Sequence, residues 1–233
     1  MMVGKEVDDA NIRMPEDAYD TGKDTPTFNA YLTVVVRDSE GKVIKVHRQR
    51  SHSPTANFIG LFLPISYFST NNVSFTITNV TGGTCTYKPG LGGSPQDIIY
   101  PNSNVNYNTY IVTIQVGSGQ QSNPYTATAL AAPIANGSGA GQLVYQPVTP
   151  PSSITINGNT AYFYITQTYN NISGGTITIT EVGIITEIQT INYTNSAHTN
   201  CGNILLWYDV LSSPISIPNG GSVTIYYTFV VNP

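Results

Sequence analysis

The stretch PISIPNGGSVTIYYTFVV, residues 214–231, decides the fold class of this chain. Two isoleucines alternate with polar residues, and the sequence PNGG at 218–221 has the composition of a tight turn. Apolar side chains then recur at every second position, which a strand places on one face: Val223, Ile225, Tyr227, Phe229 and Val231. The pattern predicts a C-terminal strand pair whose last strand is long enough to lie in the middle of a sheet.

Runs of the same kind recur along the chain, each followed by Gly, Asn or Asp residues. A hairpin is expected at 31–47, with its turn at 38–41. Further strands are expected at 73–80, 107–116 and 162–169. Strands at this spacing, without helices between them, indicate a sandwich or jelly roll rather than β-α-β units.

One short helix interrupts the strands. Ser53 would cap it, Pro54 would take the first helical position, and Phe58 would share a face with Leu61 and Phe62. The predicted fold class is therefore all-β: a β-sandwich or jelly roll with one short helix and an extended N-terminal arm.

Residues 1–27 are acidic and lack apolar periodicity, so we expect an arm outside the core that orders against a neighbouring subunit. The assembly-arm carboxylates are Asp8, Asp9, Glu16, Asp17 and Asp20. Residues 28–233 would form the β-sandwich body. The Ala-, Gly-, Pro- and Ser-rich segment 131–153 is either a domain linker or a long loop, and the strand patterns on both sides favour a loop within one body.

Charged residues make up 9% of the chain, against about 25% in an ordinary domain. Residues 37–50 carry five basic and two acidic side chains, a net of +3, and beyond residue 50 one basic and four acidic side chains remain. Two hypotheses fit this scarcity. The protein works in an acidic medium, where it has few carboxylates to protonate, or its low-charge surface is buried in an assembly.

No apolar run approaches the 18 or more residues of a membrane span, and the charged N-terminus does not resemble a signal peptide. We therefore expect the protein to be made and kept in the cytoplasm, or to leave by a route other than secretion, such as cell lysis. Cys85 and Cys201 lie in polar, turn-rich segments without metal-ligand spacing. They are either free thiols or a disulfide that would contribute roughly 4–5 kcal/mol by closing a long loop.

The pattern of reactive residues does not predict an enzyme or a cofactor. His47, His52 and His198 have few carboxylates to work with, and the Gly-rich segments 90–94 and 117–119 lack the features of a phosphate loop. The basic run 42–52 is only weak evidence for nucleic-acid binding. Pairing with the acidic arm of the same or a neighbouring subunit explains that run better.

Glu181 is the exception among the charged residues, because it continues the face of Ile177 and Ile179 towards the core. A buried carboxylate needs hydrogen-bond donors or a cation. We expect backbone amides of the loop that follows it, with a bulge at Gly183, and a calcium ion as the less favoured alternative.

Three segments in order resemble a layout found in virion structural proteins of hot-spring archaeal viruses and tailed phages. They are LTVVVRDSEGKVI at 32–44 running into 51–59, IQVGSG at 114–119 followed by TAL at 128–130, and ITITEVGI at 177–184 followed by ILLWYDVL at 204–211 and the C-terminal pair. Trp207 and Tyr208 depart from the tailed-phage pattern, in which an Arg commonly precedes the Asp. The resemblance implies a β-sandwich used in a capsid vertex, turret, spike or tail tip.

The leading hypothesis is a non-enzymatic virion structural protein that assembles with copies of itself or with other capsid or tail proteins. Its abundant tyrosines suit interfaces. The alternative is a spike module that binds a host-surface receptor or glycan through exposed Tyr side chains and Trp207. A surface-layer protein or adhesin is a third hypothesis, against which the missing signal peptide argues.

Overall fold

The structure, a computed structural model, describes residues 27–51, 53–60, 75–87, 97–101, 112–149, 151, 153–192 and 197–232. By their contacts these residues form two compact units, and each unit is discontinuous in sequence. The first contains the described residues within 27–52, 135–178 and 216–232, and the second those within 53–134 and 179–215. One boundary, at residues 134 and 135, falls inside the segment 131–153. A single body over 28–233 stays a prediction.

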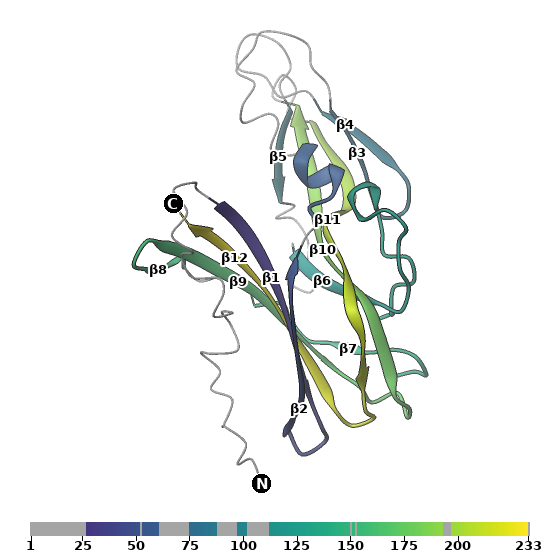
Figure 1. The fold of residues 1–233 in the computed structure, drawn as a ribbon. Helices are drawn as coiled ribbons and strands as arrows, with labels where there is room; N and C mark the ends of the chain where they lie inside the picture. The colour runs from purple at the N-terminus through teal and green to yellow at the C-terminus, as the bar shows by residue number, and fades with distance from the viewer. Residues whose placement is uncertain are drawn as a thin grey trace. The chain divides into compact units, whose positions relative to one another are not determined.

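The first unit is built on one antiparallel sheet in the order β2-β1-β12-β9-β7, with β8 paired to β9. Its strands are β1 (Thr27–Arg37), β2 (Val43–Ser51), β7 (Val144–Tyr145), β8 (Thr155–Asn157), β9 (Thr160–Asn170) and β12 (Ser222–Asn232). Figure 1 shows β1, β12 and β9 side by side. The hairpin expected at 31–47 is present as β1 and β2.

The last strand, β12, lies between β1 and β9, which confirms its predicted central position. The predicted pairing with the strand before it is wrong. That strand belongs to β11 (Ala197–Ile217), which pairs with β10 (Ile177–Asn192) in another sheet. The Pro218–Gly221 turn therefore connects two sheets, because both edges of β12 are paired, one with β1 and the other with β9.

The second unit contains the sheet of β11 and β10, with β5 (Asp97–Pro101) and β6 (Val112–Gly117) both pairing with β10. A separate hairpin joins β3 (Phe75–Thr78) and β4 (Thr84–Tyr87). Two apolar clusters fill this unit. One gathers Ile77, Ile188 and Ile204 around the cysteines, and the other packs Leu130, Ile185 and Leu205 against Tyr208. The strands expected at 73–80, 107–116 and 162–169 correspond to β3, β6 and β9.

The predicted helix is present, but it begins later than the sequence suggests. Residues 56–60 are α-helical, and Thr55 is the cap, accepting from the Phe58 amide at 3.4 Å. Ser53 and Pro54 are instead held extended against β11: the Ser53 carbonyl accepts from the Tyr208 amide at 3.0 Å, and Pro54 forms a bridge with Trp207. Leu61, Phe62 and Pro64 lie outside the described residues.

Within the described residues the fold is thus mostly β, with several antiparallel sheets and one short α-helix, which confirms the all-β class expected of a sandwich. A short 3-10 turn, η2 (Pro124–Thr126), lies in the loop after β6. The jelly-roll order stays a prediction. In the described part of the chain, no helix has the length and apolar character needed to cross a membrane.

Candidate functional site

Glu181 lies on β10 with its side chain completely buried, on the same face as Ile177 and Ile179. Its carboxylate accepts four hydrogen bonds. The backbone amides of Gly119, Ala131 and Ala132 donate at 3.2, 2.9 and 2.7 Å, and the Tyr208 hydroxyl donates at 2.8 Å. We call these residues, with Gln121, the Glu181 cluster.

The amides around Glu181 belong to the loop after β6, not to the loop following Glu181 that the sequence suggested. No loop follows, because β10 continues to Asn192. On the side that pairs with β6, Gly183 makes no bulge, since the register is unbroken from Glu181 to Thr186. Gly183 instead lets the core pack closely: a Cβ there would lie 2.6 Å from a methyl of Leu205 and 2.8 Å from one of Leu130.

The glycines of the 117–119 segment are explained by the same carboxylate. A Cβ on Gly117 would lie 2.7 Å from the Ala132 carbonyl oxygen and closer still to Oε1 of Glu181. A Cβ on Gly119 would lie 2.8 Å from both the Ala131 Cβ and the Ala132 amide nitrogen. Glycine at these positions allows the chain to close over Glu181 where β6 ends at Gly117 and residue 118 bends. The glycines therefore have a packing role.

Tyr208, on β11, extends the Glu181 cluster to a second part of the loop. Its hydroxyl accepts from the Gln121 amide at 2.7 Å while donating to Glu181. Burial raises the pKa of the Tyr208 hydroxyl well above its usual value, the hydrogen bond with Glu181 raises it further, and the Gln121 amide opposes the rise. The phenol therefore stays protonated and serves as a fixed donor.

The Glu181 cluster favours a structural role over catalysis or metal binding. All four groups that meet the carboxylate are hydrogen-bond donors, whereas calcium is bound by several oxygen acceptors. The donor set thus argues against the calcium alternative. Among the described residues, no group of three or more His, Cys, Asp or Glu side chains is arranged to hold a metal ion. The cluster fixes the loop that carries the exposed Tyr125.

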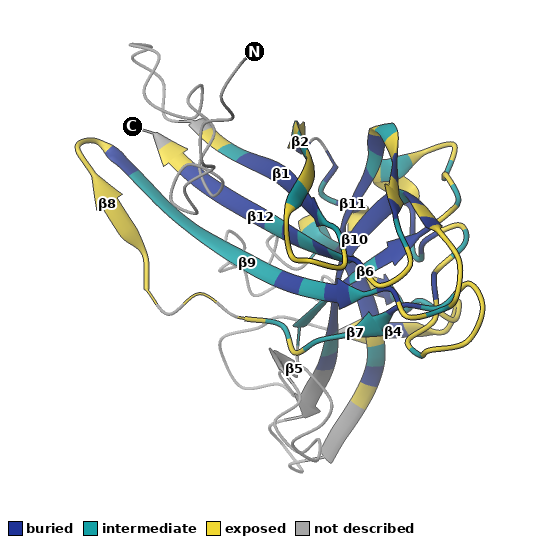
Figure 2. Cartoon of the chain, turned by 90° about the horizontal axis from the view of Figure 1, so that it is seen from below, coloured by how far each residue is buried: buried dark blue, intermediate teal, exposed yellow. Residues whose placement is uncertain are grey.

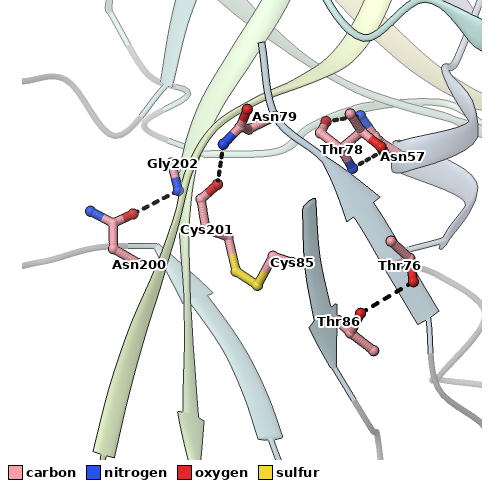
Figure 3. Close-up of a disulfide and its surroundings, with 9 residues drawn as sticks. All are labelled: Asn57, Thr76, Thr78, Asn79, Cys85, Thr86, Asn200, Cys201 and Gly202. Carbon is pink, nitrogen blue, oxygen red and sulfur yellow. Dashed lines mark hydrogen bonds between the residues drawn. A yellow bond between two sulfur atoms is a disulfide. The ribbon is translucent and has the colours of Figure 1, made fainter. Parts of the chain in front are cut away.

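Cys85 and Cys201 form a disulfide that joins β4 to β11 (Figure 3). Their Cα atoms are 5.3 Å apart, and 116 residues separate them in sequence. Both cysteines are buried in the cluster with Ile77, Ile188 and Ile204. Of the two alternatives left open by the sequence, the structure has the disulfide.

The side chains of Asn79 and Asn171 hold turns, a role that the sequence did not predict. The Oδ1 of Asn79 accepts from the amide and hydroxyl of Thr81, and Asn171 makes the same pair of bonds with Ser173. Asn171 is fully buried and also donates to the Gly175 and Ile217 carbonyls, both at 2.8 Å. The signal was present as the spacing Asn-x-Ser/Thr, which here marks turns held by the asparagine side chain.

The structure describes only some of the other predicted site residues. His47 lies on β2, where its Nε2 is 2.9 Å from Oε1 of Gln49. His52 and the side chain of His198 lie outside the described residues, as do the arm carboxylates Asp8, Asp9, Glu16, Asp17 and Asp20. Trp207, expected to be exposed for glycan binding, is only 3% exposed and packs edge-on against Phe58 at a ring distance of 5.1 Å. It cannot offer its face to a sugar.

One face of the sheet in the first unit ends in exposed apolar side chains. Phe28 on β1 lies opposite Val231 on β12, Val231 lies opposite Ala161 on β9, and Ala161 lies opposite Ile156 on β8. Directly opposed residues share a face, so these four form a row across the sheet, which we call the apolar row. Phe28, Val231 and Ile156 are 54%, 45% and 74% exposed. Figure 2 shows the exposed ends of β12 and β8.

Comparison with known proteins gives no family assignment: no protein-family model matches the chain, and neither curated proteins nor solved structures include a match.

Proposed function

We propose that this chain is a non-enzymatic structural protein of a virus particle, which assembles with copies of itself or packs against other capsid or tail proteins. The observation that carries the proposal is the apolar row. Its three large side chains stay exposed although Leu32, Ile225 and Tyr227, further along the same face, are completely buried. An apolar surface of this kind on a folded sheet is typical of a protein interface.

The apolar row is flanked on the same face of the sheet by stacked aromatic rings. Phe229 lies 6.0 Å from Phe28 and 5.1 Å from Phe163 between ring centres, with interplanar angles of 18° and 24°. Rings held in this way lose little conformational entropy when a partner covers them. This rigidity favours an interface that forms from folded subunits.

Two further observations agree with a structural role. The buried carboxylate of Glu181 accepts four hydrogen bonds from the loop after β6 and from Tyr208, which suits a role in holding the fold. The scarcity of charge suits a surface that is buried in an assembly. The order of segments that resembles virion proteins of archaeal viruses and tailed phages supports the particle as the place of assembly.

The test is the mass of the purified protein in solution, measured by light scattering over a concentration series, with negative-stain electron microscopy of the same samples. We expect a closed oligomer of defined size. The combined substitutions Phe28→Ser, Val231→Thr and Ile156→Thr should shift it towards smaller species. The control Ile172→Thr changes a side chain that is 57% exposed but lies outside the row, and should leave the mass unchanged.

A wild-type protein that stays monomeric at all concentrations would overturn self-assembly as its main role. Screening for receptor or glycan binding by the monomer would then be the next experiment, because that alternative does not require self-association.

A further inference from the structure

Strand β2 forms a basic edge of its sheet. It pairs with β1 and, among the described residues, with no other strand, so its second edge presents backbone groups. Every Lys and Arg in the described part of the chain lies between residues 37 and 50. On β2 itself, Lys45, Arg48 and Arg50 are exposed.

The basic side chains flank this edge on both sides. Lys45 lies opposite Val36 and Arg48 lies opposite Thr33, an odd number of residues apart on β2, so the two point to opposite faces of the sheet. A ligand on one face would meet only one of them. A partner that meets both must run along the edge, as an added strand does.

The chain contains one segment with the charge to match. Residues 1–24 hold seven of the thirteen acidic side chains against three basic ones, a net of −4. Near β2, Asp38 already accepts from the Glu40 and Lys42 amides in the turn, at 3.0 and 2.9 Å. Beyond residue 50, Glu181 and Asp209 are buried. The acidic segment is therefore the best complement that this sequence offers to β2.

Topology favours a second copy as the source of that segment. A strand added antiparallel to β2 runs parallel to β1, and parallel strands in one sheet need a connection of about a dozen or more residues. Because the segment enters β1 directly, its own chain would use about half of it as a crossover. A neighbouring chain has no such connection to make.

From these observations we propose that the acidic segment 1–26 of a second copy adds along the free edge of β2, with its carboxylates paired to Lys45 and Arg48. The inference rests on the proposed function, since it names the contact through which copies assemble. The contact at β2 differs from the apolar row in position and in chemistry, so the two contacts can be tested separately.

The experiment uses two full-length charge-reversed proteins. The edge variant carries Lys45→Glu and Arg48→Glu, and the arm variant carries Asp8→Lys, Asp9→Lys and Asp17→Lys. We expect each alone to raise the dissociation constant of the oligomer about tenfold or more. An equimolar mixture should recover wild-type association, because each unlike pair of chains restores opposite charges at both contacts.

Three controls define the result. Ser122→Glu with Ser138→Glu adds negative charge in exposed loops that are not part of β2 and should leave association unchanged. Wild-type association should weaken as salt rises towards 1 M, where charges are screened beyond about 3 Å. Far-ultraviolet circular dichroism of every variant should match the wild type.

The outcomes separate this inference from the function on which it rests. A wild-type monomer overturns both the inference and self-assembly as the main role. A wild-type oligomer whose mass neither variant changes overturns the β2 contact and leaves assembly standing. If each variant associates more weakly and mixing the two does not restore association, the segment binds its own chain. That result also overturns the inference. If the edge variant keeps the wild-type mass but loses binding to a single-stranded oligonucleotide, the basic edge contacts nucleic acid instead.

Discussion

The hydroxyl of Tyr208 donates to Oε2 of Glu181 over 2.8 Å, which links neighbouring strands β11 and β10 through their side chains. Because the same hydroxyl accepts from Gln121, the loop after β6 is tied to the sheet through both residues. One buried carboxylate and one buried phenol thus determine the conformation of a loop whose own sequence has no regular pattern.

Replacing Glu181 with Gln should destabilise the protein by about 2–3 kcal/mol, since the new amide group brings a donor to a site lined with donors. Urea unfolding followed by circular dichroism measures the change. Hydrogen exchange should also accelerate at the amides of Gly119, Ala131 and Ala132.

The matched control is Glu187→Gln on the same strand, where the carboxylate is partly exposed and accepts from Asn200 at 2.8 Å. It should change the free energy of unfolding by no more than about 0.5 kcal/mol. Equal effects at both positions would contradict the special role of Glu181.

Gly117→Ala should cost about 1–3 kcal/mol, because its Cβ would overlap Oε1 of Glu181 and the Ala132 carbonyl. Gly175→Ala is the comparison: a Cβ there meets nothing within 4 Å, so stability should stay the same or rise slightly. Thermal unfolding of the two variants side by side gives the answer. A tolerated Gly117→Ala would show that the loop can move away from Glu181 at little cost.

Removing the disulfide with Cys85→Ser and Cys201→Ser should lower stability by ~5 kcal/mol, as expected for a closed loop of 116 residues in the chain-entropy model. In a chain of this size that corresponds to a fall of roughly 10–20 °C in Tm. A reducing agent should lower the wild-type Tm by a similar amount and leave the double variant unaffected. A wild-type Tm that does not change with the reducing agent would show that the disulfide does not stabilise the fold.

Alkaline pH should unfold the protein cooperatively. Burial raises the pKa of Tyr169, with a further rise from neighbouring Tyr145, and burial also raises the pKa of Tyr208. The folded state therefore keeps protons that the unfolded chain releases above about pH 10, so this stability is complete below pH 10 and is lost as the pH rises. Tyrosinate absorbance should show both phenols ionising only with the loss of β structure.

Tyr208→Phe should reduce this alkaline sensitivity while lowering stability at neutral pH by about 1–3 kcal/mol, because Glu181 and the Gln121 amide lose their partner. A variant as stable as the wild type at pH 7 would show that water replaces the hydroxyl.

Strand content could be predicted because alternation is a local property. On β12 the pattern marked Val223, Ile225 and Tyr227 as facing a core, and they are buried. The same alternation placed Glu181 inward, whereas on β1 residues 30–36 are buried on both faces. What alternation cannot supply is the identity of the partner strand. The segment ending at Ile217 was expected to pair with β12 and pairs with β10 instead, since any strand with an apolar face satisfies the same local pattern.

The Glu181 cluster likewise separates a requirement that is local from partners that only the fold brings together. A buried carboxylate requires donors, which the sequence could state, but the donors come from 49 to 62 residues away in sequence. The helix cap moved from Ser53 to Thr55 for a related reason, because hydrogen bonds of Ser53 and Thr55 with β11 outweigh a local capping preference.

By itself, then, the sequence determined the β class, the inward face of β12, the inward position of Glu181, a short helix after residue 53 and the concentration of basic charge between residues 37 and 50. Tertiary structure alone decided which strands pair, that Cys85 meets Cys201, that Trp207 is buried and that the apolar row stays exposed. The physical reason is that periodicity reports only whether a side chain faces inward or outward, whereas pairing depends on long-range contacts between segments whose local patterns are nearly the same.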